Sequence, residues 1–248
     1  MSDWPQKFLR AFSERHHYDS ISADDAGLSL ADAYDIQHRY VTLRAEPITG
    51  FKAALTALPA QQAMEIQHPI IGALFASGKF DGNEEILPQQ QALLETEVGF
   101  IVAQSITERV SAESVFSQMA SCMPMIEIAS PNLATKPNGI DLIATNSASY
   151  GYLMGPICPI EQNDLDSLAV SLANGSETLL SGKAGEVLGG QRDALAWLIN
   201  QVLERGYDIE SGHILMTGSI GGMYPAKPGH YTADFDSLGK LTFTIAEH

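Results

Sequence analysis

Basic residues are scarce in this chain of 248 residues: 14 lysines and arginines stand against 30 aspartates and glutamates, for a formal net charge of −16. No local cluster of Lys and Arg offsets that charge, so the phosphates of a nucleic acid would be repelled. The composition therefore predicts that nucleic acid is not a partner.

Long apolar runs are also lacking. No stretch reaches the roughly 18 apolar residues that a membrane-spanning helix needs, and the first twenty residues carry Lys7, Arg10 and Arg15 without the apolar core of a signal peptide. The apolar content of 45% and the charged content of 18% are those of an ordinary globular protein. We therefore expect a cytoplasmic protein with no membrane partner.

Cysteine is nearly absent. Cys122 and Cys158 form neither a disulfide framework nor a zinc pattern, and they are expected to be core thiols in a reducing compartment. The nucleophile elbow, the P-loop and the H-E-x-x-H motif are missing too, which argues against a serine hydrolase, an NTPase and a zinc protease.

Three glutamates stand in apolar surroundings: Glu95, Glu97 and Glu127. If 94–102 is a strand, Glu95 and Glu97 point to the same face because side chains alternate along a strand. A third carboxylate from a second strand, Met125 to Ala129, would complete a set of three oxygen donors that suits Mg²⁺ or Mn²⁺. The alternative is a half-exposed strand whose solvated face carries ordinary glutamates.

Lys52 lies inside the short apolar segment 50–57. A buried lysine is costly unless it meets an anion, so Lys52 is a candidate partner of a substrate carboxylate or of a metal-bound oxyanion. The alternative is a packed stem with an ammonium that reaches water.

Other patterns outline the fold. Trp4, Phe8 and Phe12 predict an N-terminal helix, and Ser29 with Asp32 predicts a capped helix to about Arg44. Further on, the sequence predicts a hairpin at Asn174-Gly175, a helix from about Arg192 to Arg205, and a final strand around 241–245. We expect a small N-terminal helical region over 1–48 and a larger catalytic domain over 49–248.

Several strings together resemble one family. They are Tyr34-Asp35-Ile36-Gln37, Gly50-Phe51-Lys52 with Leu55-Thr56, Pro69 with Gly72, Glu95-Thr96-Glu97 with Phe100, the segment 141–148, and Gly212 to Ser219. In order and spacing, the chain resembles the 2-oxopent-4-enoate hydratase and 4-oxalocrotonate decarboxylase family of the fumarylacetoacetate hydrolase superfamily. The resemblance covers about residues 28 to 245.

The resemblance implies an α+β fold, a mostly antiparallel β roll like the fumarylacetoacetase C-terminal domain, with peripheral helices. It also implies a Mg²⁺ or Mn²⁺ site, a homo-oligomer and, as a further expectation, association with an enzyme of the same pathway. The residues that it implies are Glu95, Glu97 and Glu127 for the metal, Lys52 for catalysis, and Thr217, Gly218, Ser219 and Asn146 for the substrate.

By the same resemblance, the protein is expected to be a divalent-metal-dependent lyase in aromatic meta-cleavage catabolism. Its substrate would be a small 2-oxo or 2-hydroxydienoic acid, and the reaction would pass through a metal-stabilised enolate. The chain departs from the family at Ile70, Thr145 and Ala57, where the usual residues are Asp, Asp and Ser. Isoleucine cannot take a proton from water, so these departures favour decarboxylation, tautomerisation or another 2-oxo acid over hydration. A second alternative is a catalytically impaired subunit that keeps the fold for assembly.

Overall fold

The computed structural model describes residues 3–89, 91–161 and 164–247. Its α-helices are α1 (Trp4–Glu14), α2 (Ile21–Asp24), α3 (Leu30–Leu43), α4 (Leu58–Ala63), α5 (Gly139–Ala144) and α6 (Gln191–Glu204). The first six strands are β1 (Ile48–Ala54), β2 (Ile70–Phe75), β3 (Glu85–Ile86), β4 (Leu93–Val102), β5 (Met119–Ala129) and β6 (Ser149–Met154). The other strands are β7 (Ala169–Asn174), β8 (Glu177–Lys183), β9 (Ile214–Met216), β10 (Ile220–Pro225), β11 (Gly229–Asp234) and β12 (Lys240–Ile245).

The strands form two sheets. The larger has the order β2-β1-β9-β4-β5-β6, with β10 paired to the other end of β4, and the smaller has the order β3-β12-β11-β7-β8. All pairings among the described strands are antiparallel except β1 with β9 and β3 with β12. This arrangement confirms the mixed, mostly antiparallel α+β fold.

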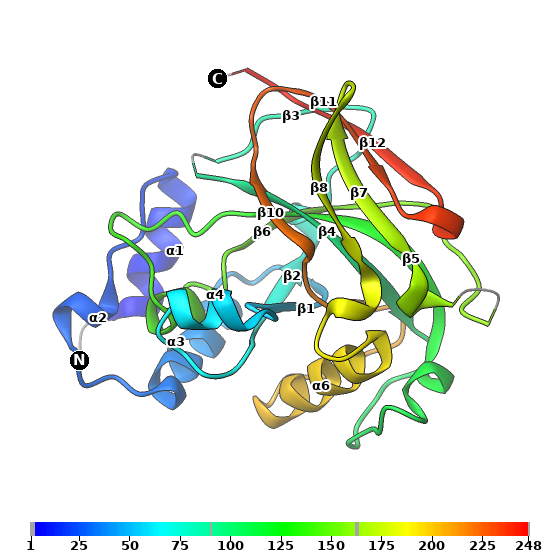
Figure 1. The fold of residues 1–248 in the computed structure, drawn as a ribbon. Helices are drawn as coiled ribbons and strands as arrows, with labels where there is room; N and C mark the ends of the chain where they lie inside the picture. Colours follow the sequence, from blue (N-terminus) through cyan, green and yellow to red (C-terminus); the bar gives the residue numbers. More distant parts are fainter. Residues whose placement is uncertain (1–2, 90, 162–163, 248) are drawn as a thin grey trace.

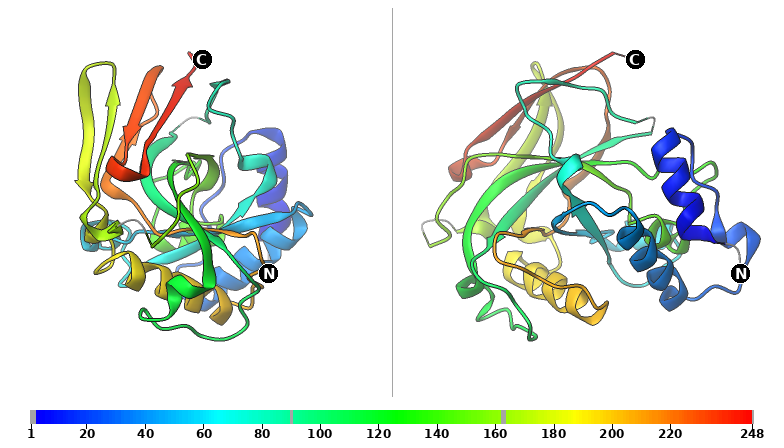
Figure 2. Two further views of the ribbon diagram at one scale, coloured as in Figure 1. Left: turned by 90° about the vertical axis from the view of Figure 1, so that its right-hand side faces the viewer. Right: turned by 180° about the vertical axis from the view of Figure 1, so that it is seen from behind.

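The helices lie outside the sheets. Figure 1 shows α6 beneath the larger sheet and α1 to α3 at the other end of the molecule from β7, β11 and β12. The two turned views in Figure 2 show the same placement of the helices relative to the sheets. The left-hand view shows the strands of the smaller sheet side by side. The division into regions 1–48 and 49–248 stays a prediction.

The elements that local signals predicted lie close to where the structure has them. The capping box at Ser29 and Asp32 is present at the start of α3, and the Asn174-Gly175 turn joins β7 to β8. Trp4 and Phe8 are buried, whereas Phe12 is partly buried under the guanidinium of Arg44, 3.9 Å from the ring centroid. The helix predicted from Arg192 begins one residue earlier, at Gln191.

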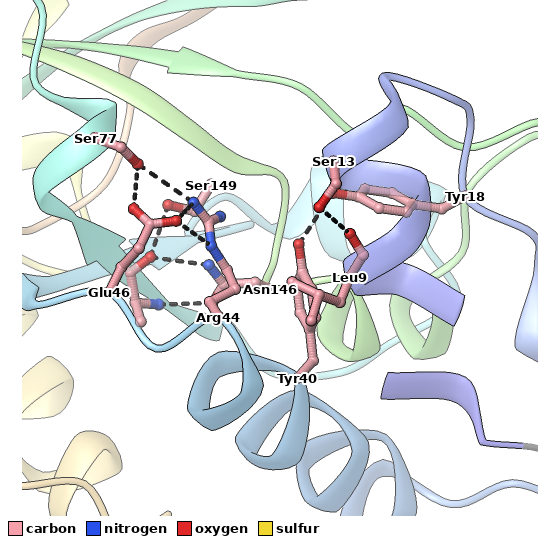
Figure 3. A network of polar contacts seen from close by, with 10 residues as sticks. Leu9, Ser13, Tyr18, Tyr40, Arg44, Glu46, Ser77, Asn146 and Ser149 are labelled. Atoms are coloured by element: carbon pink, nitrogen blue, oxygen red, sulfur yellow. Dashed lines mark hydrogen bonds and ion pairs between the residues drawn. The ribbon is translucent and has the colours of Figure 1, made fainter. Parts of the chain in front are cut away.

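The larger sheet curls into a roll that closes between β2 and β6. The side-chain amide of Asn146 donates to the carbonyl of Ala73 on β2 and accepts from its N–H, at 2.9 and 2.8 Å, and the Ser149 hydroxyl donates to the same carbonyl at 2.8 Å. Figure 3 shows Asn146 and Ser149 beside the pair that Arg44 makes with Glu46. These contacts hold the two edge strands together, so that residues on the inner face can meet.

Asp141 ties the N-terminal helices to the roll. Its carboxylate, 1% exposed, accepts hydrogen bonds from the Ser20 hydroxyl and from the N–H and hydroxyl of Ser22, at 2.8 to 3.0 Å. Hydrogen bonds to a charged group contribute about 1.5–3 kcal/mol each and do not add fully. Asp141→Ala should therefore lower the free energy of unfolding by about 2–4 kcal/mol, measured by urea denaturation.

The matched control is Asp35→Ala, because Asp35 is exposed on α3. It should change the free energy of unfolding by less than about 0.5 kcal/mol. Equal losses for the two variants would contradict a tethering role for Asp141.

Candidate metal centre

The three glutamates come together on the inner face of the roll. Glu95 and Glu127 are directly opposite each other in the register of β4 and β5, and Glu97 is two residues further along the same face of β4. Side chains that are opposite each other on neighbouring strands have Cβ atoms about 4.5–5.5 Å apart. One carboxylate oxygen of each of the three residues therefore lies within 4.8 Å of the other two.

Two of the three carboxylates are shut away from solvent. Glu97 is 0% and Glu127 is 1% exposed, whereas Glu95 is half-buried and faces a cavity. The alternative of a solvated strand face is therefore wrong for Glu97 and Glu127. Among the described residues, no group donates a hydrogen bond to Oε1 of Glu97 or to Oε2 of Glu127.

Lys52 on β1 meets these carboxylates. Its ammonium lies 2.7 Å from Glu127 Oε1, and the residue is 1% exposed. The alternative of an ammonium in water is therefore wrong. Burial alone would lower the pKa of Lys52, but the charges of Glu127, Glu95 and Glu97 outweigh it and raise that pKa, so Lys52 stays protonated.

The carboxylates repel each other in this enclosed setting. Burial, followed by the charge of Glu127, raises the pKa of Glu95 to about 7. Burial and then the charges of Glu127 and Glu95 raise the pKa of Glu97 well above its ordinary value. If all three were ionised, the cluster would hold more negative charge than the single ammonium of Lys52 can neutralise, which is why these carboxyl groups retain protons at higher pH than usual.

A divalent cation fits this donor set. Three ionised carboxylates and one ammonium leave two negative charges, which such a cation would neutralise. Buried oxygens without hydrogen-bond donors are costly unless something else satisfies them, and hard oxygen donors without His or Cys are the ligands of Mg²⁺ and Mn²⁺. Glu95, Glu97 and Glu127 are the residues that would hold the ion.

The Gly218 loop fixes one of the three carboxylates. The N–H of Gly218 donates to Oε2 of Glu97 at 2.8 Å. Gly218 has φ +119°, and a Cβ there would come within 2.4 Å of the Thr56 side chain, so glycine is required at this position. That N–H is committed to Glu97 rather than free for a substrate.

A cavity of about 640 Å³ opens onto the site and is lined by Lys52, Glu95 and Ser219. Ser219 thus lies on the cavity wall, and its role in substrate binding stays a prediction. Glu186, at the end of the short 3₁₀ turn that follows β8, also lines the cavity. Sequence reasoning missed Glu186 because nothing local marks an exposed glutamate in a turn as part of a site.

Of the four predicted substrate-binding residues, only Ser219 is among the described residues that line the cavity, and Thr217, Gly218 and Asn146 are not. The Thr217 hydroxyl donates to the Val98 carbonyl or to the Gln191 side chain, at 3.1 and 2.7 Å, and Asn146 is bonded to Ala73. Thr145 likewise bonds to the carbonyl of Asp141, at 2.8 Å. These hydrogen bonds hold the strands and turns around the site, and the substrate-binding roles of Thr217 and Asn146 stay predictions.

No family model matches this chain. Several known proteins are nevertheless similar in sequence to most of the chain. A 2-keto-4-pentenoate hydratase of Burkholderia vietnamiensis is 29% identical over 240 residues, covering 92% of this chain and 89% of the relative. A 4-oxalocrotonate decarboxylase of Pseudomonas sp. strain CF600 is 26% identical over 226 residues, covering 86% and 84%.

Solved structures share the fold. The 4-oxalocrotonate decarboxylase of Pseudomonas putida G7, complexed with magnesium and adipate, superposes with a TM-score of 0.89 at 24% identity, covering 98% of this chain and 96% of that one. The fumarylpyruvate hydrolase of Pseudomonas aeruginosa, in complex with Mn²⁺ and pyruvate, gives a TM-score of 0.63 at 13% identity, covering 82% and 91%. The chain is thus similar over most of its length to the 2-keto-4-pentenoate hydratases and to 4-oxalocrotonate decarboxylase, and it shares the fold of these two solved structures.

Proposed function

We propose that this protein is a divalent-metal-dependent lyase of the 2-keto-4-pentenoate hydratase type, which acts on a small 2-oxo or 2-hydroxydienoic acid in aromatic meta-cleavage catabolism. The observation that carries the proposal is the convergence of Glu95, Glu97 and Glu127 with Lys52 at one cavity. The similarity of most of the chain to a 2-keto-4-pentenoate hydratase and to a 4-oxalocrotonate decarboxylase supports the proposal.

Mg²⁺ is the cation that we favour for this site, with Mn²⁺ as the alternative, because all three donors are carboxylates. When bound, the ion would act as a Lewis acid toward negative charge that develops on the substrate. The 4-oxalocrotonate decarboxylase of Pseudomonas putida G7, which shares this fold, is complexed with magnesium, and this supports the choice.

The chain's own residues take the remaining roles. Lys52, held protonated by the three carboxylates, stabilises developing negative charge and can deliver a proton. The Gly218 N–H keeps Glu97 oriented. Ser219, on the cavity wall, is placed to contact the substrate beside Glu95.

Hydration also needs a group that accepts a proton from water. Ile70 lines the cavity and cannot do this, which favours the alternative of a 4-oxalocrotonate-type or other 2-oxo acid decarboxylase. Glu186 is a carboxylate on the same cavity wall that can accept the proton. We therefore place hydration first, with Glu186 as the candidate base.

The test is to supply 2-hydroxypenta-2,4-dienoate and, separately, 2-oxohex-3-enedioate to the purified protein with Mg²⁺, and to follow dienoate loss and CO₂ release. We expect Mg²⁺-dependent loss of the dienoate, reduced about a hundredfold or more by Glu186→Gln, the scale of general-base catalysis. Glu177→Gln, at an exposed position of β8, is the control and should have wild-type activity.

The other outcomes separate the alternatives. CO₂ release without dienoate loss would favour the decarboxylase. Turnover of neither substrate, with Mg²⁺ still bound, would favour the subunit that keeps the fold for assembly.

Assembly and location are further parts of the proposal. We infer a homo-oligomer in the cytoplasm, which could associate with an enzyme of the same pathway. The two free cysteines fit a reducing compartment. Of the helices in the described part of the chain, none combines the length and the apolar character that crossing a bilayer requires.

A further inference from the structure

The cavity beside Lys52 and Glu95 is lined mainly by apolar side chains away from these two residues. They come from α4 and the residue after it, from β2, from the segment before α5, from α5 and from β10: Ala60, Met64, Ile70, Pro137, Leu142 and Met223. At about 640 Å³ the cavity is of the size that holds drug-sized ligands. A five-carbon acid would leave much of this apolar wall uncovered.

Positive charge on the cavity wall is confined to Lys52. No other Lys, Arg or His occurs among the described residues that line it. The Lys52 ammonium is already paired with Glu127 at 2.7 Å. The other ionisable side chains of the wall, Glu95 and Glu186, are carboxylates.

The hydroxyl groups of the wall do not supply hydrogen-bond donors in place of the missing positive charge. Ser147 donates to the carbonyl of Ile71 at 2.6 Å, and Ser219 donates to the carbonyl of Gly222 at 2.6 Å. Thr56 lies against Gly218, at the end of the cavity where the carboxylates converge. Among the described side chains, the apolar part of the wall thus offers no cationic or hydroxyl donor to a second carboxylate.

From this distribution we propose that the site selects a monocarboxylic 2-oxo acid of more than five carbons with an apolar tail, or its 2-hydroxydienoate form, and that it rejects the dicarboxylic acid of equal length. The inference rests on the proposed function. A distal carboxylate would lose part of its hydration against the apolar wall without gaining a cationic partner, and it would be repelled by Glu186. Each buried methylene of an apolar tail instead strengthens binding about fourfold.

The experiment compares two unreactive acids of equal carbon number on the Mg²⁺-loaded protein by calorimetric titration. They are 2-oxohexanoate and 2-oxohexanedioate, with pyruvate as the reference for the 2-oxo acid group alone. We expect 2-oxohexanoate to bind at least about tenfold more tightly than pyruvate, and 2-oxohexanedioate at least about tenfold more weakly than 2-oxohexanoate.

A substitution on the wall should move the preference. Met64 is partly exposed at the end of α4, so an arginine there can keep its stem on the wall and bring a cation to the distal end. Met64→Arg should shift the ratio of the two affinities toward 2-oxohexanedioate by about tenfold or more. Met64→Leu, the matched control, should leave the ratio unchanged.

The outcomes separate this inference from the proposed function. Equal or tighter binding of 2-oxohexanedioate by the wild type would overturn the inference and leave the proposed function standing. Failure of all three acids to bind, with Mg²⁺ bound, would overturn both. Met64→Arg must first bind Mg²⁺ and have the melting temperature of Met64→Leu. If its ratio of affinities for 2-oxohexanoate and 2-oxohexanedioate is then unchanged, α4 does not face the distal end of the substrate.

Discussion

Glu97→Gln should weaken Mg²⁺ binding by about a hundredfold or more while leaving the metal-free protein folded. Glutamine keeps the size of the side chain and an oxygen that can accept the hydrogen bond from Gly218. It removes one of three buried negative charges around the proposed ion, and loss of one partner from a buried charge pair costs about 3–5 kcal/mol. Calorimetric titration with Mg²⁺ measures the loss.

The same carboxylates make Mg²⁺ affinity depend on pH. Because the pKa of Glu95 is about 7 and that of Glu97 is also raised, the ion must displace protons in neutral or acidic solution. Wild-type affinity should therefore rise between about pH 5.5 and 8, by up to about tenfold per pH unit for each proton displaced. Glu97→Gln, with one proton fewer to lose, should show a shallower rise.

Stability of the metal-free protein should move in the opposite direction. A carboxyl group whose pKa is higher in the folded than in the unfolded chain binds more protons when folded, so its contribution to stability falls as pH rises from about 4.5 to 7. The increase in melting temperature on adding Mg²⁺ should accordingly grow over that interval.

Glu108→Gln is the control for Glu97→Gln, because Glu108 is exposed and is not among the residues that line the cavity. It should bind Mg²⁺ as the wild type does. Wild-type affinity in Glu97→Gln would contradict the three-carboxylate site.

How much of this site the sequence could predict depends on the range of each interaction. The alternation along 94–102 correctly predicts that Glu95 and Glu97 share a face, because strand geometry is local. It does not predict the register that sets Glu127 opposite Glu95, since that depends on pairing with a distant strand. Family resemblance supplied Glu127.

The burial of Glu97 and Glu127 decided between a solvated strand face and an enclosed carboxylate cluster. An acid-apolar alternation is equally compatible with a wet face and with the inside of a roll, and the closure of β2 on β6 through Asn146 and Ser149 cannot be read from spacing. The resemblance implies substrate-binding roles for Asn146 and Thr217, which stay predictions, and it gives no sign that Asn146 bonds to the Ala73 backbone and Thr217 to Gln191. Such tertiary hydrogen bonds leave no local pattern in the sequence.

Lys52→Met should lower turnover by about a hundredfold or more without weakening Mg²⁺ binding. Methionine fills the space of the lysine stem but carries no charge or proton, and loss of a proton-transfer group costs about 10²–10⁴ in rate. The Lys52 ammonium lies among the carboxylates and repels a cation there. Its removal should therefore leave the affinity for Mg²⁺ equal or higher, the reverse of Glu97→Gln.

The measurements are kcat, Mg²⁺ titration and the melting temperature at saturating Mg²⁺, with Lys79→Met, exposed just after β2, as the control. Without the metal, Lys52→Met leaves three buried carboxylates with no cation, so its melting temperature should fall more at pH 8 than at pH 6. Saturating Mg²⁺ supplies the missing positive charge and should bring the melting temperature back toward that of the wild type. A melting temperature that stays low with Mg²⁺, together with lost turnover, would assign Lys52 to folding, because a lysine needed only for chemistry leaves the metal-bound structure intact.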